Sequence, residues 1–480
     1  MRKHALFLLP VLSAFMIFGQ ALDSRAGRPS VSPQDAGRLV TLLRDNSFRE
    51  ADKLAAALLA DPAVEAPTLA LCGLAVLKAG RIPQAEAIFN KVLSRSPDNP
   101  EAHLGLGRIG RIRNDPDAAL AHLRRAVASA AFYEEALRQL WKTAWDRGLV
   151  SDLFEIHKLA VERYGRESKP LPSWFTNGLG QVQGLAGKQL YQMEGRFERL
   201  RIPLVRNEDM RIPNRMVSIK LNGKNDYLFS IDSASADFMT VSPLLAAELG
   251  LSMTGNSTAT GVGTATAAVR FSMLDKVELG GITFRNVPVM VSDLQTFRGL
   301  KKGLIGTALL KRFNVTIDVE AGMMDLFPLD QPELLAANID RLAVAADVPL
   351  YLFDQTTVEA SLAGAPAALY ILDSAAATNL VDGPFFEEHI KPKLDPARIV
   401  SGGIMGAQGA QSVNRIDGLS IGLGPLVFDG QQVNEFSMEM LNAIAGRYTA
   451  GLLGNPLLWP YRVHMDFRTG RLILERYPGS

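Results

Sequence analysis

The segments Tyr227-Leu-Phe-Ser-Ile-Asp-Ser-Ala-Ser235 and Ala368-Leu-Tyr-Ile-Leu-Asp-Ser-Ala-Ala376 repeat one pattern. In each, an apolar run ends on an aspartate, a serine and two small residues. A carboxylate that follows a buried apolar strand is costly unless a partner or a function compensates for its burial. Because the arrangement occurs twice, the sequence predicts that the two carboxylates, those of Asp232 and Asp373, meet in one site.

The sequence around each copy repeats as well. A hairpin precedes each apolar run, with its turn at Asn222-Gly223 in the first copy and around Gly364 in the second. Each copy closes with one phrase, Gly303-Leu-Ile-Gly306 or Gly451-Leu-Leu-Gly454, and then with two apolar strands joined by a turn. This internal duplication predicts two consecutive β-rich lobes.

Two neighbouring carboxyl groups offer a specific chemistry. They do not both ionise easily, so they share a proton and titrate as a pair. One can act as a general base on a water molecule while the other donates a proton to a carbonyl oxygen. Because this chemistry needs no metal and no covalent intermediate, we expect no cofactor.

At these residues the sequence resembles the pepsin and retropepsin superfamily of aspartic peptidases, over about residues 200–480. The resemblance implies a mainly-β bilobal fold in which Asp232 and Asp373 are the catalytic pair. It implies that the hydroxyl groups of Ser233 and Ser374 support this pair. It also implies a glycine-bearing flap over each half of a peptide-binding cleft. The flap glycines would be Gly261, Gly263, Gly402 and Gly403.

The third residue of each motif departs from the family pattern. Most members have glycine there, whereas this chain has Ala234 and Ala375. A Cβ in such a tight turn can strain the backbone. Two functions therefore stay open: an endopeptidase that hydrolyses peptide bonds, or a catalytically inactive peptidase fold that binds peptides as a scaffold.

Residues 32–166 are predicted to be helical, with a period of about 34 residues that is typical of tetratricopeptide repeats. Small residues recur where paired helices must approach closely. The pattern resembles these repeats at Gly73, Gly80, Ala85, Phe89 and Pro97, and one period later at Gly107, Asn114, Ala119 and Leu123. The resemblance implies a solenoid that recruits a protein partner or substrate. The alternative is a packing platform for the second half of the chain.

The domain boundaries follow from changes of pattern. The segment Lys169-Pro-Leu-Pro172 does not continue a helix, and alternation of apolar and polar residues begins at Leu200. The predicted units are a signal peptide (1–21), helical repeats (32–166), a linker (167–199), a first lobe (200–332), a connection (333–347) and a second lobe (348–480).

The first 21 residues have the pattern of a secretory signal. Arg2 and Lys3 precede an apolar stretch over residues 5–19, and small residues occupy positions 19 and 21. We therefore expect an exported protein, periplasmic or secreted, with no stable membrane span after signal cleavage. An uncleaved anchor is the alternative.

The composition narrows the classes of partner. The 480 residues carry 51 basic and 50 acidic side chains without a basic cluster, so nucleic acid is not an expected partner. Cys72 is the only cysteine, and the histidines lack the spacing of a zinc site. A peptide or protein substrate is the expected ligand.

Four further aspartates in the lobes are weaker candidates for a catalytic role. Asp318 and Asp466 occupy the same place before a hairpin turn in each copy, so we expect them to cap those turns. Asp237 and Asp354 have no counterpart in the other copy and are expected on the surface.

Overall fold

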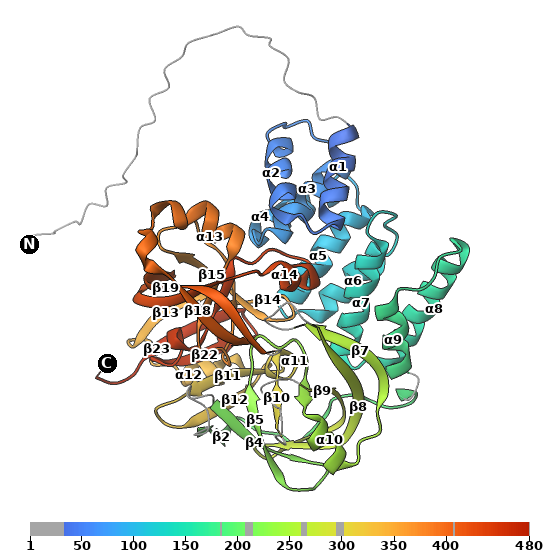
Figure 1. The fold of residues 1–480 in the computed structure, drawn as a ribbon. Helices are drawn as coiled ribbons and strands as arrows, with labels where there is room; N and C mark the ends of the chain where they lie inside the picture. Colours follow the sequence, from blue (N-terminus) through green and yellow to red (C-terminus); the bar gives the residue numbers. More distant parts are fainter. Residues whose placement is uncertain are drawn as a thin grey trace, which may run out of the picture.

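The computed structural model describes residues 33–182, 185–206, 215–260, 266–293, 302–406 and 409–479. A helical region is followed by a mainly-β region, which confirms the fold class predicted from the sequence (Figure 1). The predicted signal peptide, residues 1–21, lies outside the described residues, as do Gly261 and Gly263. Within the described part, no helix combines the length and the apolar character needed to cross a bilayer.

Consecutive helices of the N-terminal region pack against one another. Close approach explains the repeated glycines: a Cβ on Gly73 or Gly105 would lie within 2.5 Å of the ring of Phe89. Asn99 and Asp115 cap the helices that follow them by accepting backbone hydrogen bonds. The helices are α1 (Pro33–Arg44), α2 (Phe48–Leu59), α3 (Ala66–Lys78), α4 (Ile82–Leu93), α5 (Pro100–Ile112), α6 (Pro116–Ala126), α7 (Tyr133–Arg147) and α8 (Val150–Arg166).

The segment predicted as a linker contains two regular elements. Helix α9 (Ser173–Val182) buries Phe175, whose ring lies 4.9 Å from that of Trp141 on α7. Strand β1 (Gln192–Glu194) pairs with β9 (Ile282–Ser292) of the first lobe. The segment therefore packs against both the helical region and the first lobe.

The first lobe is built on a nine-stranded sheet. At its centre, β5 pairs antiparallel with β4 and parallel with β10, so that the strand before Asp232 is enclosed on both sides. Its further elements are β3 (Val205–Arg206), β4 (Arg215–Leu221), β5 (Asp226–Ile231), β6 (Met239–Val241), α10 (Pro243–Leu249), β7 (Thr254–Thr260), β8 (Thr266–Leu279), β10 (Gly303–Ile305) and α11 (Thr307–Leu310).

The second lobe repeats this pairing on an eight-stranded sheet. Strand β16, which precedes Asp373, is antiparallel to β15 and parallel to β21. The elements are β14 (Tyr351–Leu352), β15 (Thr356–Leu362), β16 (Ala368–Leu372), β17 (Asn379–Asp382), α13 (Gly383–His389), β18 (Ile399–Gly406), β19 (Gly409–Leu423), β20 (Leu426–Phe436), α14 (Glu439–Ala445) and β21 (Gly451–Leu453), with short 3-10 turns at Lys391–Lys393, Pro396–Arg398 and Asn455–Leu457.

A six-stranded sheet joins the two lobes. Its order is β13-β23-β22-β11-β12-β2, so the strands that flank the second lobe's sheet in the chain lie on one side and the strands of the first lobe lie on the other. The central contact is between β11 and β22, where Thr316 lies opposite His464. Its elements are β2 (Leu200–Pro203), β11 (Phe313–Asp318), β12 (Met323–Pro328), α12 (Pro332–Ala337), β13 (Val344–Pro349), β22 (Tyr461–Asp466) and β23 (Arg471–Arg476).

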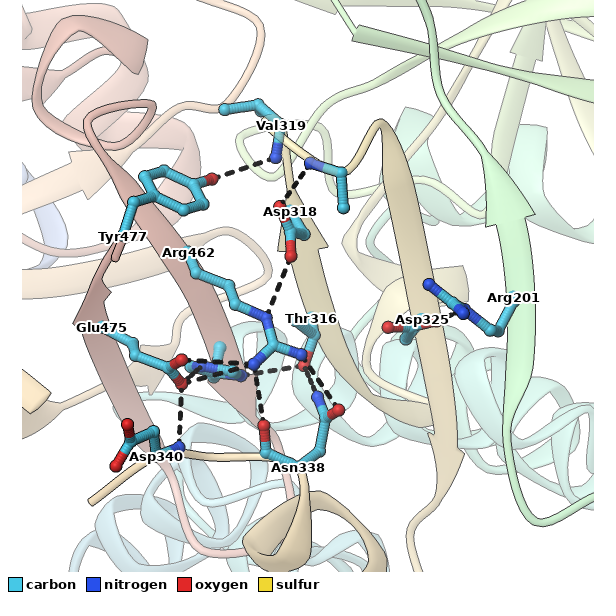
Figure 2. Close-up of polar contacts among 12 residues, drawn as sticks. Arg201, Thr316, Asp318, Val319, Asp325, Asn338, Asp340, Arg462, Glu475 and Tyr477 are labelled. Carbon is cyan, nitrogen blue, oxygen red and sulfur yellow. Dashed lines mark hydrogen bonds and ion pairs between the residues drawn. The ribbon is translucent and has the colours of Figure 1, made fainter. Parts of the chain in front are cut away.

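Polar side chains connect the lobes across this sheet (Figure 2). Arg462 of the second lobe pairs with Asp318 of the first at 3.2 Å and with Glu475 at 3.2 Å. His464 is fully buried, with one ring nitrogen 2.9 Å from Glu475 and the other 2.8 Å from the hydroxyl of Thr316. Because the buried charged groups of this network pair with one another, the network stabilises the junction.

The two aspartates before the hairpin turns bond as expected. Asp318 accepts a hydrogen bond from the amide of Ala321 at 2.8 Å. Asp466 accepts one from the amide of Thr469 at 2.9 Å. These bonds satisfy turn amides, which is the ordinary structural use of aspartate at such positions.

The helical region packs on the lobes through charged side chains. Asp354 pairs with both Arg111 and Lys142, and Lys311 pairs with Asp146 at 2.7 Å. The expectation that Asp354 and Asp237 are surface residues is wrong: Asp354 is enclosed by solenoid cations, and Asp237 is half-buried. The solenoid is therefore, at least along this edge, the packing platform that the sequence left as an alternative.

Candidate active site

The two aspartates stand at equivalent ends of central strands. The amide of Asp232 donates to the carbonyl of Ile305 at 3.0 Å, and that of Asp373 donates to the carbonyl of Leu453 at 2.9 Å. The repeated Gly-x-x-Gly phrase supplies both of these acceptors. It therefore fixes the strand end from which each carboxylate projects.

The last glycine of each phrase is required by close approach of two backbones. A Cβ on Gly306 would lie 2.3 Å from the carbonyl oxygen of Asp237. A Cβ on Gly454 would lie 2.5 Å from the carbonyl oxygen of Thr378. No side chain fits at such distances, so the two lobes hold their aspartate loops by the same backbone contact.

The two serines connect the lobes reciprocally. The amide of Ser233 donates to the hydroxyl of Ser374 at 3.1 Å, and the amide of Ser374 donates to the hydroxyl of Ser233 at 3.0 Å. Each hydroxyl then donates across to the strand end of the other lobe: Ser233 to Leu372 at 2.7 Å, and Ser374 to Ile231 at 2.8 Å. These four bonds bring the Asp-Ser segments of the two lobes together.

One oxygen of each carboxyl group is held by the loop that follows it. Asp232 Oδ1 accepts hydrogen bonds at 2.9 Å from the amides of Ala234 and Ser235. Asp373 Oδ1 accepts the corresponding pair at 2.8 and 3.0 Å. The second oxygen of each group makes no hydrogen bond to another described residue, so it is available to a ligand.

Burial and proximity change the acidity of both groups. Burial raises the pKa of Asp232 to about 6, against the opposing effect of its two amide hydrogen bonds. Burial, together with the negative charge of Asp232, raises the pKa of Asp373 to about 8. The pair therefore holds a proton near neutral pH while one member is ionised, as general acid and base catalysis by two carboxyl groups requires.

The alanines at the third motif position are not strained. Neither Ala234 nor Ala375 is among the non-glycine residues of the described chain that have positive φ. Ala234 packs, together with Ala376, against a small buried cluster that includes Ile371. The methyl groups are thus accommodated by ordinary backbone conformations.

The predicted flap of the second lobe is a hairpin. Gly402 and Gly403 lie in β18, opposite Val413 and Ser412 of β19. Ile404, the next residue, packs against the same cluster as Ala234, which places this hairpin beside the active-site loops. In the first lobe, β7 and β8 flank the predicted flap glycines, which lie outside the described residues.

Two threonines near the pair were not found from the sequence. The carbonyl of Ser233 accepts hydrogen bonds from the Thr307 hydroxyl at 2.8 Å and from the Thr356 amide and hydroxyl at 3.0 Å each. Thr307 directly follows Gly306, so the repeated phrase could have pointed to it. Thr356 has no such signal, because Arg215 stands at the corresponding distance before Asp232.

Comparison with known families agrees with both sequence resemblances. Residues 217–309 match the family model described as aspartyl protease, and residues 73–137 match the model described as tetratricopeptide repeat. Both resemblances are confirmed. The first match includes Asp232, Ser233 and Thr307, and therefore one half of the site. No curated protein matches the chain.

The site is built from carboxyl, hydroxyl and backbone groups. Among the described residues, no three histidine, cysteine, aspartate or glutamate side chains are grouped so that they could hold a metal ion. Cys72 is buried in α3 of the helical region, and burial raises the pKa of its thiol to about 12. It therefore has the properties of a structural residue rather than of a nucleophile.

Proposed function

We propose that this chain is an exported aspartic endopeptidase, periplasmic or secreted, that hydrolyses peptide bonds. The observation that carries the proposal is the reciprocal hydrogen bonding of Ser233 and Ser374. It joins two Asp-Ser segments whose carboxyl groups have raised pKa values, one of them raised further by the charge of the other.

The chemistry would proceed through a bound water. The ionised carboxyl group removes a proton from this water, whose oxygen attacks the peptide carbonyl carbon. The protonated carboxyl group donates to the carbonyl oxygen, and a tetrahedral gem-diol results. The carboxyl group that took the proton from water then gives it to the amide nitrogen, while the other carboxylate takes a proton from a hydroxyl of the gem-diol. The C–N bond breaks, and the pair again holds one proton.

The helical repeats would bring a protein partner or substrate to this site. Their helices already contact the lobes, for example where Arg108 of α5 donates to the carbonyl of Gly446 at 3.0 Å. A substrate held by the repeat surfaces that remain free would thus stay near the lobes. This would raise its effective concentration at the active site.

A second candidate function is peptide binding without cleavage. Ala234 and Ala375, at positions where the family has glycine, favour this alternative. In that case the paired carboxyl groups would still bind a peptide carbonyl, while the attacking water would be displaced.

The two functions are separated by substitution of the aspartates. The purified protein is incubated with a diverse peptide library over a range of pH, and cleavage is followed by mass spectrometry. We expect Asp232→Asn and Asp373→Asn each to lower cleavage by about 10²–10⁴-fold, since a positioned acid or base contributes this much. The double variant should be little worse than either single one, because the pair acts as a unit.

Asp429→Asn is the matched control, since Asp429 is exposed in β20. It should leave cleavage unchanged. Full activity of Asp373→Asn would contradict the proposed mechanism. Peptide binding without cleavage by the parent, unchanged by both substitutions, would establish the second function.

A further inference from the structure

A cavity of about 840 Å³ lies between the helical region and the lobes. Its walls come from the turn between α5 and α6, the end of α7, the segment before β1, the end of α11 and the turn between β22 and β23. Asp232 and Asp373 are not part of these walls. The cavity is therefore distinct from the aspartate pair, although Thr307, which donates to the carbonyl of Ser233, also lines it. Its size is that of a ligand pocket.

The acidic groups of the cavity wall are already engaged. Asp354 pairs with Arg111 and Lys142, and the carboxylate of Asp146 pairs with Lys311. The two remaining acids also have partners: Asp117 lies 3.7 Å from Arg147, and Asp115 accepts from the amide of Ala118 at 3.0 Å. These acids do not pair with the other cations of the wall.

Arg312 is a cation without a carboxylate partner in this wall. Its guanidinium group stacks on the ring of Tyr191 at 4.6 Å and on that of Phe238 at 5.5 Å. One nitrogen donates to the backbone carbonyl of Asp146, while the buried Nε has no partner among the described residues. Burial lowers the pKa of this group, against the opposing effects of Tyr191 and Asp146.

Two further donors face the same cavity. Tyr191 lines it, and its hydroxyl makes no hydrogen bond to another described residue, although Tyr191 is buried. Arg468 is exposed at the cavity wall, and its side chain has no ion-pair partner in the part of the chain that the structure describes. Together with Arg312, they form a set of donors without a carboxylate partner among the described residues.

We propose that this cavity binds the carboxylate of a short apolar peptide. The planar guanidinium group of Arg312 fits a carboxylate through two parallel hydrogen bonds, and a buried unpaired cation gains most from such a partner. The rest of the peptide would contact the apolar part of the wall. This part is formed by Met193, Phe284, Leu329 and Leu352.

The carboxylate could be the free C-terminus of a peptide or an acidic side chain within it. The cavity and its unpaired donors do not depend on the aspartate pair, so this binding goes beyond the proposed peptidase function. Binding can therefore be measured on full-length protein carrying Asp232→Asn, in which cleavage is blocked and the cavity is unchanged.

Calorimetric titration with three probes tests the proposal. They are acetyl-Leu-Phe-Leu with a free C-terminus, its C-terminal amide, and acetyl-Leu-Phe-Glu amide. We expect at least one of the two acids to bind about tenfold or more tightly than the neutral amide, because hydrogen bonds to charged groups are the stronger ones. The acid that binds more tightly identifies the source of the carboxylate.

Arg312→Gln should remove this preference for the acid, whereas Arg95→Gln, at an exposed position after α4, should keep it. Tyr191→Phe removes only the hydroxyl, so it tests the site even if Arg312→Gln does not fold; it should weaken acid binding severalfold. Equal binding of acids and amide by the parent would overturn the proposal. So would a preference that survives both Arg312→Gln and Tyr191→Phe, or complete competition by inorganic phosphate.

Discussion

The two lobes present their aspartates in the same way but support them unequally. In both, a central strand between an antiparallel and a parallel neighbour ends on Asp-Ser. The parallel neighbour carries the Gly-x-x-Gly phrase. The carbonyl of Ser233, however, accepts three hydrogen bonds from Thr307 and Thr356. No described residue donates to the carbonyl of Ser374. The loop after Asp232 thus receives hydrogen bonds at its serine carbonyl that the loop after Asp373 lacks.

The difference originates in two positions of the sequence. Asn455 replaces Thr307 after the glycine phrase, and its side-chain nitrogen has no partner among the described residues. Arg215 stands where the second lobe has Thr356. The two halves therefore share the groups that bring the carboxylates together. They differ in the residues that donate hydrogen bonds to the serine carbonyls.

The largest expected effect is on the pH dependence of stability, which should differ between Asp373→Asn and Asp232→Asn. Asp373 has a pKa of 3.8 in an unperturbed chain and about 8 in the folded protein, so the folded state binds more protons between these values. The stability of the parent should fall as pH rises through this range. Asp373→Asn, which keeps the acceptor oxygen, should remove more of this slope than Asp232→Asn does.

Urea unfolding at several pH values measures the slopes. The gain in stability of Asp373→Asn over the parent should reach several kcal/mol by the upper end of the range, because one pKa unit corresponds to about 1.4 kcal/mol. Parallel pH profiles of the parent and Asp373→Asn would show that this carboxyl group is not perturbed.

The serines test the symmetric part of the comparison. Ser233→Ala and Ser374→Ala each remove a hydroxyl that accepts one bond and donates another across the lobes. Each should cost about 1–3 kcal/mol of stability, because buried partners lose their bonds. The costs should be similar, and the double variant should lose less than their sum.

Urea unfolding of the four proteins, with Ser401→Ala in exposed β18 as the control, gives these values. A large cost for one serine and none for the other would show that only one lobe depends on the crossed bonds.

Thr356→Val tests the support that the carbonyl of Ser233 receives and that of Ser374 lacks. The hydroxyl donates to the carbonyls of Ser233 and Leu372, and valine has the same shape without it. We expect a loss of about 1 kcal/mol in thermal or urea unfolding. Thr283→Val in β9, whose hydroxyl has no hydrogen bond to another described residue, should change stability less. Equal effects of the two substitutions would remove the proposed asymmetry.

The smallest effect is expected at the alanines. Because neither Ala234 nor Ala375 has positive φ, glycine relieves no strain at either position. It increases the freedom of the unfolded chain and should cost about 0.5–1 kcal/mol per site. Peptide cleavage by the double glycine variant should not exceed that of the parent. A marked gain in cleavage would show instead that the methyl groups obstruct the site.

The sequence predicted features that depend on local pattern. The apolar strands, the repeated Asp-Ser motif and the spacing of the helical repeats are visible because each is encoded by neighbouring residues. Through the family resemblance, the same patterns also predicted that the two lobes pair and that their serines support the aspartates.

Features that depend on distant partners were missed. Asp354 was expected on the surface because an isolated carboxylate is best solvated by water, but Lys142 and Arg111 reach it from α7 and α5. The hydrogen bond from Thr356 to the carbonyl of Ser233 could not be predicted from the sequence either, since Ser233 belongs to the other lobe. The packing of α9 likewise depends on Trp141, which lies in another helix.

The shared six-stranded sheet constrains the order in which the protein can fold. Its strand β11 must pair with β22, and β13 with β23, which come much later in the chain. The first lobe therefore has an unpaired sheet edge until β22 has been synthesised. Unpaired edges promote aggregation, and long-range pairing is slow. Removing β22 and β23 should thus impair the first lobe as much as the second, although the two aspartate loops lie in separate sheets.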